Sequence, residues 1–391
     1  MNQLHEPVLT AAGRAVDSMD FFGRVSAGIR RLVPFDSAVW TSADPETGLI
    51  TAPMLVQNLG SGEGCAAYWE SELLEENIVP FRDLARAVVP AAGLRAVTGD
   101  LPARSARFRR LFAGQGIHDE LRVALRIGDR PWGLVSLFRA TAAFTAAEVS
   151  LLADLAQPLA ARLRGFARPV PSATHTEAPA PGLILFDETG TAVAINAEAR
   201  QHIALLPPGP SVATGLGLDL PIWLLGTVLQ ARARATGLDH GNARLRIRNI
   251  EGRWLCCHAS DLTGTGGRPG PVALIIEPAT PADLAVLIAE AHGLTSRELQ
   301  ITQLIVRGLT TGEIAGTLFL SPHTVRDHIK SVFAKVEVGS RGELVARLFT
   351  EHYWPALPDP VRISEPGNPP AHVRAAGSPN AAHAPRTDPR R

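Results

Sequence analysis

Helix-start signals recur four times between Leu294 and Phe349, and this stretch restricts the fold more than any other part of the chain. Each signal is a Ser or Thr that can accept a hydrogen bond from a backbone N–H in the first turn of a helix. These residues are Thr295, either Thr310 or Thr311, Ser321 and Ser340. Glu298 and Glu343 complete capping boxes for the first and last helices, and Pro322 favours the first helical position after Ser321. The stretch is therefore predicted to form four short helices.

Apolar residues in this stretch recur three and four positions apart, as expected for helices that bury one face. The predicted inner residues of the first helix are Ile301, Leu304, Ile305 and a close-packed Gly308, and those of the second are Ile314, Ala315 and Leu318. In the third helix they are Val325, Ile329, Val332, Phe333 and Val336. His328 falls on the inner edge of the third helix, where a packed histidine is expected.

The opposite side of the third helix is polar. Its residues are His323, Thr324, Arg326, Asp327, Lys330 and Ser331. A helix inserted in the major groove of DNA meets base edges with such a face, mostly near its N-terminus. Arg326 has the forked geometry that recognises guanine, while Lys330 can reach a base or a phosphate. Asp327 can accept a hydrogen bond from cytosine or can orient Arg326. These three residues are the predicted base contacts.

Backbone phosphates are the expected partners of a second group of residues, because hydroxyls, cations and helix N-termini bind them. This group consists of Ser321, His323, Thr324, Ser331, Lys335 and Arg341. Between Gly293 and Thr350, seven basic and five acidic residues leave a small positive excess. Net charge therefore gives little support for DNA binding, and the prediction depends on the helix-start signals and on the polar face of the third helix.

The segment GLTSRELQITQLIVRGLTTGEIAGTLFLSPHTVRDHIKSVFAKVEVGSRGELV resembles the LuxR/FixJ-type helix-turn-helix domain over nearly its whole length. The LT-x-RE start, the EIA helix, the LFLSPHTVR-x-H turn and the V-x-SR-x-EL helix all match in register. The resemblance implies that Arg326, Asp327 and Lys330 read bases. It also implies that the fourth helix serves dimerisation, through Leu344, Val345 and Leu348.

Two residues depart from that family pattern. Glu337 occupies the position after the recognition helix where the family usually has Gly, at a cost of about 1 kcal/mol if the residue is left-handed. Gly316 lies inside the second helix, where glycine costs about another 1 kcal/mol relative to alanine. Both departures are expected to weaken the module without changing its role.

Residues 17–165 are predicted to form an α+β domain. A helical apolar period over 19–32 precedes strands at 37–42, 121–127 and 131–139, and the capping box Thr145–Glu148 begins a closing helix. Asp129 and Arg130 are the predicted hairpin tip. The pattern LRVALRIGDRPWGLVSLFR followed by FTAAEVSLLADLAQPLAARL resembles GAF-type sensor domains. The resemblance implies a domain that holds a small molecule or mediates dimerisation.

A second α+β domain is predicted at 182–277, after a proline-rich linker at 166–181. Its expected elements are strands at 182–187 and 191–195, a helix capped by Asn196, a hairpin over 243–260 and a last strand at 271–277. GLILFDETGTAVAINAEAR resembles PAS-type domains. Residues 288–352 form the helix-turn-helix domain. Residues 355–391 contain nine prolines and no apolar period, which predicts a disordered tail.

Composition excludes several other classes. No secretory signal or membrane span is visible, and the cysteines Cys65, Cys256 and Cys257 are too few for a disulfide framework, so a cytoplasmic protein is expected. Cys256, Cys257 and His258 suggest a metal site. However, neighbouring residues of a strand point to opposite faces, which favours burial as small hydrophobes. No cofactor, metal or catalytic set is predicted.

The sequence thus favours a multidomain α+β plus all-α chain that acts as a sequence-specific transcription regulator. Double-stranded DNA, a second copy of the chain, a small-molecule ligand of the two front domains and RNA polymerase are the candidate partners, and no membrane is expected. Two alternatives from other classes are an enzyme with a helical appendage and a protein-binding scaffold.

Overall fold

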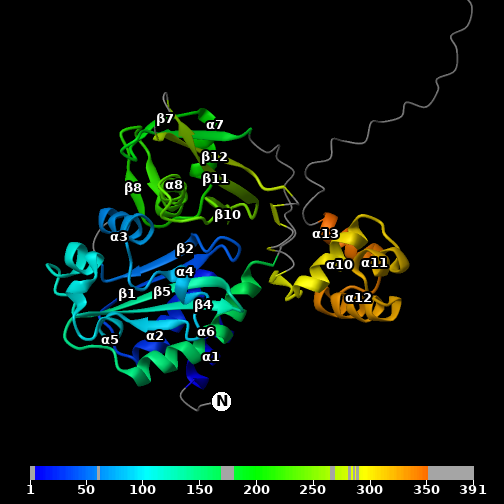
Figure 1. Cartoon of the computed structure of the whole chain (residues 1–391), viewed down its shortest axis with the longest axis horizontal. Helices are drawn as coiled ribbons and strands as arrows, with labels where there is room; N and C mark the ends of the chain where they lie inside the picture. Colours follow the sequence, from blue (N-terminus) through cyan, green and yellow to red (C-terminus); the bar gives the residue numbers. More distant parts are fainter. Residues whose placement is uncertain are drawn as a thin grey trace, which may run out of the picture. The chain divides into compact units, whose positions relative to one another are not determined.

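The computed structural model describes residues 5–59, 62–168, 180–264, 269–280, 283–284, 287 and 290–350. It contains two five-stranded sheets, each with its own helices and here called the first and second domains, and a C-terminal helical module, here defined as residues 290–350 (Figure 1). Most of the predicted linker and the whole predicted tail at 355–391 lie outside the described residues.

The first domain is a five-stranded sheet with the strand order β2-β1-β5-β4-β3, and all neighbouring strands are antiparallel. Its strands are β1 (Ser37–Ala43), β2 (Ile50–Gln57), β3 (Ala91–Gly93), β4 (Asp119–Ile127) and β5 (Arg130–Arg139). Its helices are α1 (Glu6–Gly13), α2 (Ser18–Arg30), α3 (Gly62–Leu74), α4 (Phe81–Leu84), α5 (Leu94–Thr98), η1 (Pro102–Arg104), η2 (Phe108–Phe112) and α6 (Ala146–Phe166).

Helices cover both faces of this sheet, because β4 alternates between two cores (Figure 1). Leu121, Val123 and Leu125 belong to the same apolar core as the buried residues of α1, α2 and α6. Ala124 belongs to the other core, together with residues of α3 and α4. The first domain is therefore a three-layer sandwich.

The sequence predicted the outer elements of this domain better than the inner helices. The predicted α2, β1, β4, β5 and α6 are confirmed, including the capping box at Thr145. The hairpin tip lies one residue earlier than predicted, because Gly128 takes the left-handed conformation of the turn. The helix α1 was missed, and it packs on α2 and α6. The strand β2 was also missed. It is an edge strand that contains Pro53, and proline weakens a strand prediction.

The second domain is another antiparallel sheet, in the order β10-β11-β12-β6-β7. Its strands are β6 (Gly182–Phe186), β7 (Ala192–Ile195), β10 (Arg244–Arg248), β11 (Trp254–Thr263) and β12 (Pro269–Pro278), with a separate pair β8 (Ser211–Ala213) and β9 (Asp219–Pro221). Its helices are α7 (Ala197–Ala204) and α8 (Ile222–Ala235). The predicted strands and the Asn196 cap are confirmed. The helix α8 was missed, because it is buried nearly all round and lacks an amphipathic period.

A buried ion pair joins the two front domains. Asp44, which follows β1, accepts hydrogen bonds from Nε and Nη2 of Arg246 in β10, at 2.8 and 2.6 Å. The two side chains are 1% and 2% exposed. Arg246 Nη1 also lies 3.0 Å from the Glu46 carboxylate and donates to the carbonyl of Asp283, in the segment that leads to the helical module. This guanidinium thus contacts two other parts of the chain, the segment after β1 and the segment that leads to the helical module.

The helical module consists of α10 (Ser296–Val306), α11 (Thr311–Leu318), α12 (Pro322–Val336) and α13 (Arg341–Thr350), as the four start signals predicted. The predicted inner residues Ile301, Ile314 and Val325 form its core. Thr310, rather than Thr311, caps α11. The prediction of a close-packed Gly308 is wrong, because no atom lies within 4 Å of a Cβ built there. This glycine instead has a φ of +85° that ends α10.

None of the helices in the described parts of the chain has both the length and the hydropathy needed to cross a membrane.

Candidate DNA-binding site

The helix α12 begins at a strong local start signal. The hydroxyl of Ser321 accepts a hydrogen bond from the backbone N–H of Thr324 at 3.1 Å, and Pro322 is the first helical residue. Ser321, His323 and Thr324 are all exposed around this N-terminus. The helix dipole makes such an end favourable for a phosphate. Their predicted role as phosphate contacts agrees with this placement and stays a prediction.

The three predicted base contacts lie on the exposed face of α12. Arg326, Asp327 and Lys330 are all exposed, while Val325 and Ile329 between them are buried. Asp327 lies 3.0 Å from the imidazole of His323, one turn earlier on the same face. The structure therefore pairs Asp327 with His323, whereas the sequence suggested Arg326 as its neighbour. His328 is half-buried, as its inner-edge position predicts.

Two residues predicted to contact phosphate are engaged within the module. The Ser331 hydroxyl donates to the Glu298 carboxylate of α10, and so does the Lys335 ammonium at 2.6 Å. Burial by itself raises the pKa of the Glu298 carboxyl, but hydrogen bonds from Lys335, Ser331 and Thr295 outweigh it and lower the pKa to about 2. Glu298 thus holds α12 against α10, a role that its capping-box position alone did not reveal.

Arg341 is also engaged within the module. Its guanidinium donates to the carbonyl of Leu309 at 2.8 Å and to the hydroxyl of Thr311 at 2.9 Å. These bonds fasten the start of α13 to the start of α11. A phosphate contact by Arg341 would have to share its guanidinium with these two acceptors.

The predicted dimerisation residues differ in accessibility. Leu344 is fully buried in the core of the module, and Val345 is half-buried. Leu348 lies in α13, but its side chain is outside the described part of the structure. Leu344 accordingly packs within its own module and is not accessible to a second copy of the chain. Of the predicted dimerisation residues whose side chains are described, Val345 is the accessible one.

Two non-glycine residues end helices of the module in the left-handed conformation. Glu337 follows α12 with a φ of 61°, so the strain expected from the sequence is present. Phe319 follows α11 with a φ of 54°, and its side chain is 95% exposed. The helix α12 therefore has a strained residue at each side. Glu337 directly follows it, and Phe319 lies two positions before its N-cap.

The cysteines of the second domain do not converge on a metal site. Cys257 is fully buried, and burial raises the pKa of its thiol. Cys256 is also buried, and its Sγ accepts a hydrogen bond from Arg244 Nε at 3.1 Å. His258 is half-exposed beside Glu277. Among the described residues, no group of three potential ligands is placed to hold a metal ion.

The first domain contains a buried charged cluster that the sequence analysis did not single out. Arg122 of β4 lies 2.6 Å from the Glu72 carboxylate of α3, and Arg107 pairs with Glu72 and Glu120. The Tyr68 hydroxyl donates to Glu120 at 2.9 Å, and burial raises the pKa of this phenol to about 12. Two arginines and two glutamates balance in charge. The cluster therefore stabilises the interior and offers no free acid or base.

Two helices joined by a tight turn, the second with exposed polar residues near its N-terminus, are the arrangement of the helix-turn-helix class of DNA-binding domains. The family model for bacterial regulatory proteins of the luxR family matches residues 292–348. The spore germination protein GerE of Bacillus subtilis (strain 168) is 44% identical over 55 residues, which are 14% of this chain and 74% of that protein. The chain therefore belongs to the luxR family of bacterial regulatory proteins.

Two further relatives match this chain over stretches of similar length. A putative HTH-type transcriptional regulator of Aeromonas salmonicida is 42% identical over 59 residues, 15% of this chain and 30% of that protein. The transcriptional regulatory protein DesR of Bacillus subtilis (strain 168) is 39% identical over 61 residues, 16% of this chain and 31% of that protein. The chain thus spans less than a third of these two relatives. The likeness carries no information about its front domains.

Solved structures with distant similarity include a bacteriophytochrome from R. palustris, with a TM-score of 0.31, 12% identity and coverage of 71% of this chain and 62% of that one. The phage VqmA–DPO complex has a TM-score of 0.22 and 19% identity, and the match covers 48% of this chain and 87% of that one. Similarity at this level supports no argument about either front domain.

Proposed function

We propose that this protein is a sequence-specific transcription regulator that binds double-stranded DNA through α12. One observation carries the proposal: the helix begins at a Ser-Pro cap and exposes Arg326, Asp327 and Lys330 on one face, while its other face is buried in the module. Arg326 reads guanine, and Lys330 contacts a base or a phosphate. Ser321, His323 and Thr324 position the helix on the DNA backbone.

Two of the predicted phosphate contacts are bound within the module, so fewer residues of α12 remain available for DNA. Ser331 and Lys335 hold α12 against α10 through Glu298, so their effect on DNA is mainly to orient the helix. Arg326 and Lys330 have no such partner among the described residues and are the cations of α12 left available to DNA. An association-only module would have no need for an exposed polar face at the start of α12.

Fluorescence anisotropy with a labelled duplex, measured over a series of salt concentrations, tests the proposal. Lys330→Ala should weaken binding to all sequences and reduce the slope of log affinity against log salt by about 1. Arg307→Ala is the charge-matched control, because Arg307 is exposed at the C-terminal end of α10 and is not part of α12. Unchanged affinity and slope in both Lys330→Ala and Arg326→Ala would refute DNA binding by this face.

We also propose that the protein acts as a homodimer, with α13 at the contact, and that the front domains resemble GAF-type and PAS-type sensors of a small molecule. In this dimer, Val345 and Leu348 are the proposed residues of contact with the second copy. RNA polymerase is a further candidate partner. Sedimentation at micromolar concentration, with and without DNA, provides the test. Monomer alone under both conditions would refute the dimer.

A further inference from the structure

A cavity of about 710 Å³ lies where residues of the two front domains meet. Its volume is within the range of roughly 300–1,000 Å³ that is typical of small-molecule sites. The first domain contributes Trp132 and Phe166 to its lining, and the second domain contributes Arg248 and Trp254. The lining also includes the arginines Arg168 and Arg246. A mainly apolar wall with a few charged groups is typical of sites that hold an apolar body by its charged end.

Arg248 is the unusual residue of this lining. Its side chain is half-buried, and its Nε is buried without a hydrogen-bond partner, although Nη2 donates to the carbonyl of Arg168 at 2.8 Å. In the described part of the chain, no carboxylate forms an ion pair with it. Burial lowers the pKa of its guanidinium, and no opposite charge offsets that effect. A partly desolvated cation without a counter-ion favours binding of an anion.

The neighbouring arginine of the same strand shows the contrast. Arg246 also lines the cavity, but Asp44 and Glu46 neutralise it. Burial lowers the pKa of Arg246, yet the hydrogen bonds and charge of Asp44 outweigh it and leave the pKa above its usual value. Of these two arginines, Arg248 is therefore the one without a carboxylate partner among the described residues.

Aromatic walls flank this charge. The Arg248 guanidinium lies 5.1 Å from the ring centroid of Trp254, a distance suited to a cation–π contact that fixes its direction. Trp132 is almost fully buried in the core of the first domain, and Phe166 is half-buried at the end of α6. Phe166 and Trp254, which are only half-buried, therefore present apolar surface to a molecule that places an acidic group on Arg248.

We propose that this cavity binds a small organic carboxylate, with the carboxylate on Arg248 and an aromatic or aliphatic body against Phe166 and Trp254. The proposal assigns a ligand class to the sensing role that is proposed above for the front domains. Its interpretation as sensing rests on that proposed function, whereas binding of the carboxylate does not. Arg246 also holds the carbonyl of Asp283, so the occupied cavity would adjoin the segment that leads to the helical module.

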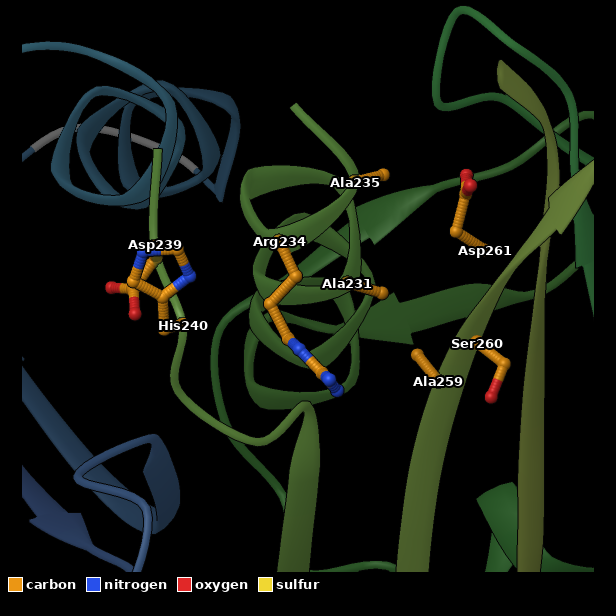
Figure 2. A pocket seen from close by; sticks show the side chains of 8 residues that line it. All are labelled: Ala231, Arg234, Ala235, Asp239, His240, Ala259, Ser260 and Asp261. Carbon is orange, nitrogen blue, oxygen red and sulfur yellow. The ribbon is translucent and has the colours of Figure 1, made fainter. Parts of the chain in front are cut away.

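A second, smaller pocket of about 410 Å³ provides the comparison. Figure 2 shows it between the end of α8 and β11, with the side chains of Arg234, Ser260 and Asp261 around it and His240 on the loop before β10. Arg234 is exposed, so water solvates its charge and an anion gains less there. Arg234 is therefore the matched control for Arg248.

Calorimetric titration of the full chain without DNA tests the proposal with two probes of similar shape, naphthoate and the neutral naphthylmethanol. The wild type should bind naphthoate at least about tenfold more tightly than the alcohol, as expected for a gained charge-assisted hydrogen bond. Arg248→Met should remove this preference and Arg234→Met should keep it. Trp254→Ala should weaken binding of both probes.

Circular dichroism confirms that each variant is folded, and Arg248→Lys provides a second variant that retains the charge and should keep part of the preference. Failure of naphthoate to bind, equal affinity for the two probes, or an unchanged preference in Arg248→Met would overturn the proposal. Because DNA is absent from the titration, any of these results leaves the DNA-binding proposal untouched.

Discussion

At the scale of single residues, the helix α12 combines exposed polar side chains with a strained residue at its end. Arg326 and Lys330 are free to meet DNA, whereas Lys335 and Arg341 are held by Glu298, Leu309 and Thr311. Sequence spacing alone did not separate these two kinds of cation, because both kinds are polar residues on or beside one helix. Only the position of the partner carboxylate or carbonyl distinguishes them.

Strain at Glu337 leads to a prediction about stability. Glycine at this position removes the left-handed penalty of a side chain, so Glu337→Gly should stabilise the helical module by about 1 kcal/mol. Hydrogen exchange of the α12 amides in the full chain measures this free energy of local unfolding. Glu337→Ala keeps the Cβ and loses the same carboxylate, so it serves as the control. Equal stabilisation by alanine would show that strain is not the cause.

At the scale of helices and strands, the sequence predicted elements whose faces differ in polarity. The helix α12 and the strands β4 and β5 have clear starts, ends or alternation. The helix α8 was missed because ten of its residues are buried, and a helix that is apolar all round has no period to detect. Capping boxes at Thr145 and Thr295 were predicted because they depend on residues only three positions apart.

The link between α10 and α12 gives a pH-dependent prediction. Glu298 has a pKa of about 2 in the folded chain, below its ordinary value, so its carboxylate stabilises the fold fully above about pH 4.5 and loses this effect as the pH falls toward 2. The loss should be on the order of 2 kcal/mol. Hydrogen exchange of α10 and α12, corrected for intrinsic rates, measures it.

Glu298→Gln should lower the stability of the module at pH 7 and should flatten its dependence on pH below 4.5. Glu313→Gln is the control, because Glu313 caps α11 from an exposed position. A similar loss of stability in both variants would mean that the contacts with Ser331 and Lys335 contribute nothing beyond the cap.

At the scale of the whole molecule, the front domains are joined through groups that lie about two hundred positions apart in the chain, such as Asp44 and Arg246. Sequence reasoning had no means to pair them, because no local pattern relates a residue after β1 to one in β10. For the same reason the sequence did not indicate the cavity beside them. Long-range contacts of this kind depend on the fold.

Removal of one partner of this buried pair should be costly. Asp44→Asn or Arg246→Met should each lower the free energy of unfolding by about 3 kcal/mol, because an uncompensated charge or donor stays buried. The double variant should lose much less than the sum of the single losses. Urea denaturation of all four proteins, followed by tryptophan fluorescence, measures this coupling. Additive losses would show that the two groups act independently.

The recognition of a specific DNA sequence by α12 is tested most directly by selection of bound duplexes from a random-sequence library with the full chain. The wild type should enrich a defined sequence that includes a guanine read by Arg326, and Arg326→Ala should relax the preference at that position alone, at a cost of about 1–3 kcal/mol for the original site. Arg307→Ala should select the same sequence as the wild type. Absence of any enriched sequence, or an identical selected sequence with Arg326→Ala, would contradict recognition by this helix.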